Sequence, residues 1–124
     1  MTVMIERRQW TTGCALTQLQ PERGVAVLLP DGSQAAVFRT HDGTVYALDN
    51  VDPACGAAVL SRGIVGDRGG VPTVTSPMLK HVYELASGRC LTDDSLAVDV
   101  VPVRVRGDEV QVAYAGERAL PMAG

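Results

Sequence analysis

The sequence contains no long hydrophobic run, and this limits where the protein can work. A membrane-spanning helix needs about 18 or more apolar residues in succession. The longest apolar stretches here, such as residues 25–29, are far shorter. At the N-terminus the two arginines follow the apolar residues, which is the wrong order for a secretory signal peptide. We therefore expect a cytoplasmic protein that does not bind a membrane.

Basic charge, paired cysteines and aromatic side chains are also scarce. Lysine and arginine number 11 against 14 aspartates and glutamates, so the formal net charge is −3 and argues against nucleic-acid binding. Three cysteines are an odd count that does not build a disulfide framework, and cytoplasmic thiols stay reduced. The aromatic residues are one Trp, three Tyr and one Phe, which do not form an evident electron relay.

Short apolar segments separated by glycine and proline make up most of the chain. The 13 glycines and 7 prolines are spread over 124 residues, a pattern typical of an all-β domain with many turns. The best helical candidate, residues 57–62, is too short to stand alone. The expected strands cover residues 11–16, 24–29, 34–40, 44–48, 96–105 and 109–113.

Residues 24–48 predict a three-stranded antiparallel meander. Pro-Asp-Gly-Ser at residues 30–33 favours a tight turn, because proline fixes φ and glycine accepts a positive φ. His-Asp-Gly at residues 41–43 predicts the second turn. In the third strand, alternation places Val45 and Ala47 on one face of the sheet and Tyr46 and Leu48 on the other.

The middle of the chain differs from both ends. Residues 49–91 are rich in glycine and proline, and long irregular segments of this kind are often functional. The glycine-rich stretch at residues 63–70 does not match a phosphate-binding loop and is expected to be a tight connection. We predict one domain over residues 1–114, followed by a flexible tail at 115–124. An outer β scaffold (8–48 and 92–114) would carry a loop-rich subdomain (49–91).

Two segments of this subdomain carry a family resemblance. Residues 46–56 (Tyr-Ala-Leu-Asp-Asn-Val-Asp-Pro-Ala-Cys-Gly) and 76–88 (Ser-Pro-Met-Leu-Lys-His-Val-Tyr-Glu-Leu-Ala-Ser-Gly) resemble the two cluster-binding loops of a Rieske [2Fe–2S] domain. That family places Cys-x-His in the first loop and Cys-x-x-His in the second, so that two Cys hold one iron and two His the other. The resemblance implies a Rieske-like antiparallel β-sandwich with an inserted loop subdomain.

The resemblance also implies that the cluster ligands are missing. The four ligand positions fall on Asp52, Ala54, Ser76 and Leu79. Alanine and leucine have no donor atom, and serine is a poor ligand for iron–sulfur chemistry. We therefore expect this chain to bind no cluster, metal or other cofactor.

Within the Rieske-like proteins, the chain resembles the small subunits of NADH-dependent assimilatory nitrite reductases. Four segments carry this resemblance: residues 48–53, 59–69, 87–91 and 102–105. It implies a large-subunit partner that carries flavin, an iron–sulfur cluster and siroheme and reduces nitrite to ammonium. This chain would then be a non-catalytic subunit, inactive in isolation.

The tips of the two loops are the candidate docking surface, because a Rieske domain meets its electron partner there and arginine is enriched at interfaces. The candidate residues are Asp52, Pro53, Cys55, Arg62, Arg68, Met78, Leu79 and His81.

Two other functions stay open at this point. A Rieske-type, ferredoxin-like electron-transfer protein could hold an atypical metal site with Asp52, Cys55 and His81. An independent enzyme could use Cys55 as a nucleophile beside His81. Against both, Cys55 is also an ordinary small loop residue, and His81 a polar replacement for a packing aromatic.

Overall fold

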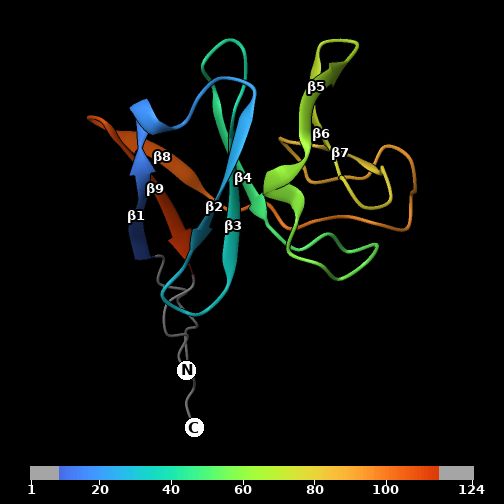
Figure 1. Ribbon diagram of the computed structural model, residues 1–124, viewed down its shortest axis with the longest axis horizontal. Coiled ribbons are helices and arrows are strands. Elements are labelled where there is room, and N and C mark those ends of the chain that lie inside the picture. Colours follow the sequence, from blue (N-terminus) through green and yellow to red (C-terminus); the bar gives the residue numbers. More distant parts are fainter. Residues whose placement is uncertain (1–8, 115–124) are drawn as a thin grey trace, which may run out of the picture.

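The computed structural model describes residues 9–114, and this part of the chain is built from antiparallel strands and two short 3₁₀ turns (Figure 1). The all-β fold is thereby confirmed. The tail expected at residues 115–124 lies outside the described residues. Within residues 9–114, no helix is long and apolar enough to span a membrane. The elements are β1 (Gln9–Ala15), η1 (Leu16–Gln18), β2 (Arg23–Leu28), β3 (Gln34–Arg39), β4 (Val45–Asp49), η2 (Leu60–Arg62), β5 (Ile64–Arg68), β6 (Val71–Thr75), β7 (Val82–Glu84), β8 (Val103–Arg106) and β9 (Glu109–Tyr114).

The strands form three small sheets, with the orders β1-β9-β8, β2-β3-β4 and β5-β6-β7. The second sheet is the predicted meander. Its first turn closes with Leu29 N donating to Ser33 O at 2.8 Å, and its second with Gly43 N donating to Thr40 O at 2.9 Å. Gly32 and Gly43 both have a φ of +91°, as the turn prediction required.

The meander carries a hydrophobic core on each of its faces. Ala36, Phe38 and Leu48 face one core, whereas Ala35, Val37 and Ala47 face the other. The predicted alternation in β4 is therefore confirmed. We call the first the loop-side core: Ala36, Phe38, Leu48, Leu60, Val74, Tyr83, Leu85, Cys90 and Val98. The second is the scaffold core: Leu19, Val27, Leu29, Ala35, Val37, Ala47, Val110 and Val112.

The middle segment is more regular than its composition indicates. Residues 64–75 form the β5–β6 hairpin, and β7 completes a third sheet. The glycine-rich stretch is thus mostly strand, with the turn confined to Gly69 and Gly70, whose φ values are +60° and +90°. Pro72 is tolerated in β6 because it lies just past the residues that pair with β7, Thr73–Thr75; its carbonyl still accepts from Leu85 N at 3.0 Å.

Two other segments are less regular than expected. Of residues 96–105, only the end belongs to a strand, β8, while Ala97 and Val100 form isolated bridges to Arg89 and Leu48. Of residues 57–62, only the single turn η2 is helical. The backbone of both segments bonds instead to neighbouring parts of the chain: Leu60 N donates to Asn50 O at 3.0 Å, and Val101 N donates to Ala47 O in β4 at 2.9 Å.

The first and last described strands are neighbours. β1 pairs with β9 from Gln9 opposite Tyr114 to Ala15 opposite Glu109, with a register shift between Thr12 and Cys14. The guanidinium of Arg104 in β8 lies 4.0 Å from the ring centroid of Trp10, stacking across the same sheet. The scaffold is therefore assembled from both ends of the described chain.

Candidate functional site

The first loop, between β4 and η2, turns tightly around Asp52. The backbone N–H of Asp52 donates to Ala57 O at 2.9 Å, and its carbonyl accepts from Cys55 N at 3.2 Å and Gly56 N at 2.7 Å. Gly56 has a φ of +77°, a conformation that favours glycine. The loop is therefore fixed by its own backbone around one residue.

Asn50 anchors the start of this loop and was not singled out from the sequence. Its side chain is buried, and its Oδ1 accepts from Ser61 N at 2.7 Å. Its Nδ2 donates to Gln34 Oε1 at 3.0 Å and to Ala58 O at 3.3 Å. One amide thus ties the loop to β3 and to η2.

The second loop, between β6 and β7, is closed by Ser76 N donating to His81 O at 2.9 Å. Its Ser76 Oγ also accepts from Met78 N at 3.3 Å. Lys80 has a φ of +64°, a left-handed conformation that is uncommon for a residue with a side chain. The backbone thereby presents Met78 and Leu79 outward, 53% and 55% exposed.

A buried carboxylate joins the two loops. Asp52 is 0% exposed and accepts hydrogen bonds from Ser76 Oγ of the second loop and from Ala54 N of its own loop, the latter at 2.9 Å. A third donor is the Tyr83 hydroxyl of β7, at 2.7 Å from Asp52 Oδ1. Every one of these partners donates, which suits an ionised carboxylate that can only accept.

The electrostatics of the site agree with this hydrogen bonding. Burial by itself raises the pKa of Asp52, but the hydrogen bonds from Ser76, Tyr83 and Ala54, together with the charge of His81, outweigh it and hold that pKa below its ordinary value. For Tyr83, burial and then the hydrogen bond to Asp52 raise the pKa above its ordinary value. Asp52 is therefore the acceptor and Tyr83 the neutral donor.

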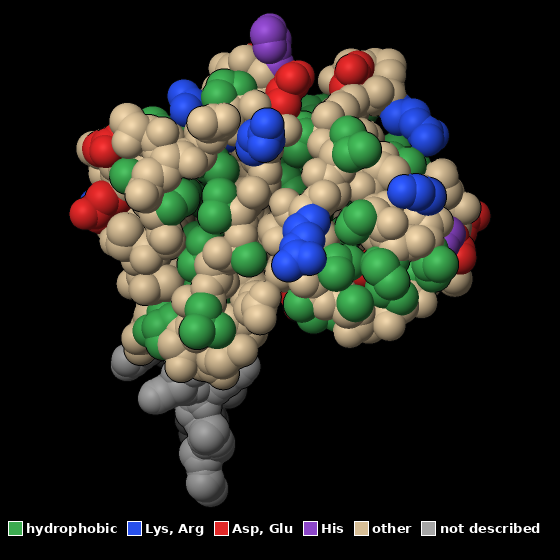
Figure 2. Space-filling view, viewed as in Figure 1, with side chains coloured by type: hydrophobic (Ala, Val, Ile, Leu, Met, Phe, Trp, Pro, Cys, Tyr) green, Lys and Arg blue, Asp and Glu red, His purple; other side chains and the backbone are tan. Residues whose placement is uncertain are grey.

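Asp52 does not belong to the predicted docking surface, because its side chain is wholly buried. Pro53 and Cys55, the next candidates in the loop, are exposed. Figure 2 shows hydrophobic side chains gathered at the lower right, where the loop after β4 lies in Figure 1. Two further exposed apolar residues were not among the docking candidates from the sequence. They are Val51 in this loop (39% exposed) and Ile64 at the start of β5 (72% exposed).

The remaining candidates are spread out. Arg62 is exposed in η2, directly after the first loop, but Arg68 lies by the β5–β6 turn, at the opposite end of β5 from Ile64 and its partner Thr75. His81 Nδ1 lies 2.9 Å from Thr92 Oγ1. Among the described hydrogen bonds, none joins His81 to Cys55.

The side chains around the two loops offer few ligands for a metal. In residues 9–114, no group of three or more His, Cys, Asp or Glu side chains is placed to bind an ion. The oxygens of Asp52 already accept from three donors, and the resemblance predicts Ala54, Ser76 and Leu79 at the other ligand positions. This donor set does not fit a [2Fe–2S] cluster, which requires thiolate and imidazole.

Comparison with known proteins places these features in a family. Residues 9–113 match the family described as a Rieske-like [2Fe-2S] domain. The NADH nitrite reductase small subunit of Escherichia coli (strain K12) is 37% identical over 105 residues, spanning 84% of this chain and 96% of that protein. A crystal structure described as an NADH-dependent nitrite reductase small subunit from Mycobacterium tuberculosis is 55% identical, covers 87% of this chain and 96% of its own, and superimposes with a TM-score of 0.84.

A further relative is a much larger protein. The NAD(P)H nitrite reductase large subunit of Klebsiella oxytoca is 41% identical over 105 residues, which are 85% of this chain but 11% of that protein. A unit similar to this chain is therefore part of one polypeptide with the rest of that large subunit.

Proposed function

The chain belongs to the Rieske-like [2Fe-2S] domain family and, within it, to the small subunits of nitrite reductases, and on this premise we propose that it acts as a metal-free docking subunit of a cytoplasmic NAD(P)H-dependent nitrite reductase. It is homologous to the small subunit of that oxidoreductase. Nitrite reduction to ammonium, and the flavin, iron–sulfur cluster and siroheme that it uses, would reside on the large subunit. The isolated chain would be inactive.

The choice of partner is supported by the Klebsiella oxytoca protein. There, a unit 41% identical to this chain is covalently joined to a nitrite reductase large subunit. A covalent link keeps the two parts at a high effective concentration, and separate chains need an interface to achieve the same association. The large subunit is therefore the partner we propose for this chain.

The proposal that this chain carries no cluster is supported by the chemistry of its loops. Ala54 and Leu79 offer no donor atom where the family has histidines, and Asp52 is engaged by three hydrogen-bond donors. Without a redox centre the chain cannot relay electrons, so its contribution would be to bind and order the partner.

We propose that the partner contacts the loop tips. Met78 and Leu79 are more than half exposed although apolar, and Pro53 and Cys55 are exposed on the neighbouring loop. Adjacent exposed apolar side chains on rigid backbone are a common feature of protein interfaces. Arg62, exposed directly after the first loop, would add a charged contact at the rim.

The test is co-expression with the large subunit, followed by affinity measurement and nitrite-dependent NADH oxidation with and without this chain. We expect Met78→Asp with Leu79→Asp to weaken binding by about a hundredfold, as expected when a charge enters an apolar contact. Leu28→Asp is the matched control, because Leu28 is also apolar and 71% exposed but lies on β2, outside the two loops. Equal binding by both variants would refute the docking face. An oxidation rate that does not depend on this chain would refute the function.

A further inference from the structure

We infer that the hydrogen bonds among Asp52, Ser76 and Tyr83 form a metal-free clamp that holds the two loops in the conformation that the docking face needs. The clamp occupies the positions at which the family uses iron to join the same loops. The effect on the partner rests on the proposed function, whereas the clamp itself can be tested on this chain alone.

The clamp joins two positions that carry cluster ligands in the family. In a Rieske domain two cysteines, one from each loop, bind the same iron and so cross-link the loops through the metal. The equivalent positions here are Asp52 and Ser76, 24 residues apart in the sequence, and the serine hydroxyl donates directly to the aspartate carboxylate. A hydrogen bond to an ionised acceptor therefore stands where two metal–ligand bonds stand in the family.

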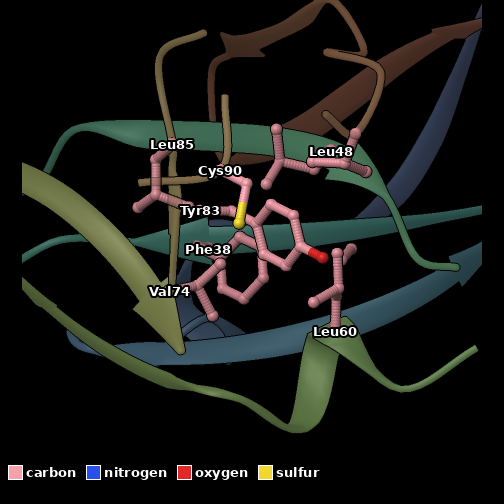
Figure 3. Close-up of a cluster of buried hydrophobic side chains, with 9 residues drawn as sticks. Phe38, Leu48, Leu60, Val74, Tyr83, Leu85 and Cys90 are labelled. Atoms are coloured by element: carbon pink, nitrogen blue, oxygen red, sulfur yellow. The ribbon is translucent and has the colours of Figure 1, made fainter. Parts of the chain in front are cut away.

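Tyr83 connects this cross-link to the core. It is 0% exposed, and its ring lies among Phe38, Val74 and Leu60 in the loop-side core (Figure 3). Its hydroxyl reaches the edge of the cluster and donates to Asp52 Oδ1 at 2.7 Å. The loops are thus joined to each other and to the loop-side core.

The clamp also reaches the docking residues. Ser76 Oγ donates to Asp52 and, through its lone pair, accepts from Met78 N at 3.3 Å. Asp52 likewise accepts from Ala54 N in the first loop at 2.9 Å, beside the exposed Pro53 and Cys55. One buried carboxylate consequently fixes the backbone of both tips, while their exposed side chains remain available for contact. Asp52, Ser76 and Tyr83 are therefore positioning residues.

The experiment is amide hydrogen exchange on the isolated chain, comparing Ser76→Ala and Tyr83→Phe with the wild type. The reporters are the amides of Ala54, which donates to the Asp52 carboxylate, and of Cys55 and Gly56, which donate to the Asp52 carbonyl. Met78 is a reporter in Tyr83→Phe alone, because Ser76→Ala removes its acceptor directly. Loss of one clamp bond leaves a buried carboxylate with an unmet acceptor, so we expect exchange at these amides to accelerate about tenfold or more. Amides of the β1–β9 ladder are expected to keep their protection.

Two matched variants control for loss of a hydroxyl elsewhere. Ser87→Ala removes an exposed serine hydroxyl that bonds Glu84, and Tyr46→Phe alters a second tyrosine packed against the loop-side core. Both are expected to leave the loop amides unchanged. Equal loop protection in wild type, Ser76→Ala and Tyr83→Phe would overturn the clamp. If Tyr83→Phe lowers protection throughout the chain, Ser76→Ala alone decides.

Binding to the large subunit separates the clamp from the docking proposal. If Met78→Asp abolishes binding while Ser76→Ala retains full affinity, the loops do not need the clamp to dock, and the inference fails while the proposed function stands. If Ser76→Ala speeds loop exchange but Met78→Asp binds normally, the clamp stands and the docking face is elsewhere. We expect Ser76→Ala to loosen the loops and to weaken binding by about tenfold.

Discussion

Gly88 and Val98 meet backbone to backbone. Val98 N donates to Gly88 O at 2.8 Å, and a Cβ placed on Gly88 would lie only 1.9 Å from Val98 O. Gly88 also has a φ of +76°, which an L side chain rarely adopts. This contact fastens the turn after β7 to the irregular segment that leads to β8, and it leaves no room for any residue other than glycine.

We predict that Gly88→Ala lowers the free energy of unfolding by about 2–5 kcal/mol, the sum of backbone strain and a clash that must displace Val98. Gly107→Ala is the control, because Gly107 has a φ of +62° but nothing within 4 Å of the added Cβ. It should cost about 1 kcal/mol, from strain alone. Denaturant unfolding measures both, and equal losses would contradict the close approach.

The pKa of Asp52 predicts a specific acid sensitivity. Because that pKa is lowered in the folded chain, the ionised carboxylate stabilises the fold above the unfolded value of about 3.9, and this stabilisation is lost as the pH falls through the folded pKa. We expect the free energy of unfolding to fall more steeply below about pH 5 in the wild type than in Asp52→Asn. Asp42, which is exposed, and Asp93, which is half-buried, also have lowered pKa values, but both titrate in both chains. Parallel pH curves would contradict the prediction.

The two faces of the meander predict one cooperative unfolding transition, because β3 and β4 line both cores. Trp10 fluorescence reports on the scaffold, and thiol labelling of the buried Cys90 reports on the loop-side core. We expect both probes to give the same midpoint. Phe38→Ala should move both midpoints together and lower the free energy of unfolding by about 3–5 kcal/mol. Midpoints that separate would show two independent units.

Introducing the four ligands of the family is expected to let this chain bind an iron–sulfur cluster. In the variant Asp52→Cys, Ala54→His, Ser76→Cys, Leu79→His, the donor set becomes that of a Rieske loop pair. After reconstitution with iron and sulfide, we expect this variant to retain iron and absorb visible light, and the wild type to do neither. Iron retained by the wild type would contradict the metal-free proposal. A variant that stays colourless would contradict the family geometry of the loops.

The sequence predicts the meander well because its signals are local. The turn at residues 30–33 and the alternation in β4 are each contained within a few residues, and the structure confirms both. The β5–β6 hairpin was missed because Gly66 and Pro72 read as strand breakers when their neighbours are unknown. The proline is acceptable because it lies just past the end of the pairing with β7, which the sequence does not reveal.

The location of the site could be predicted from the sequence, but its hydrogen-bond partners could not. The family resemblance placed the two loops, but it assigned Asp52 to the surface, whereas the side chain is buried. Its partners Ser76 and Tyr83 lie 24 and 31 residues away, and no local pattern links them. The burial of this carboxylate could not be predicted, because the donors that stabilise it are brought together only by the fold.

The pairing of β1 with β9 has a consequence for how such a domain can be used in evolution. Gln9 and Tyr114 stand opposite each other, so the described chain enters and leaves the domain at one place. A unit with adjacent ends can be spliced into a surface loop or appended to a longer polypeptide without separating the points of attachment. The same architecture therefore suits both a separate chain and a segment of a larger enzyme.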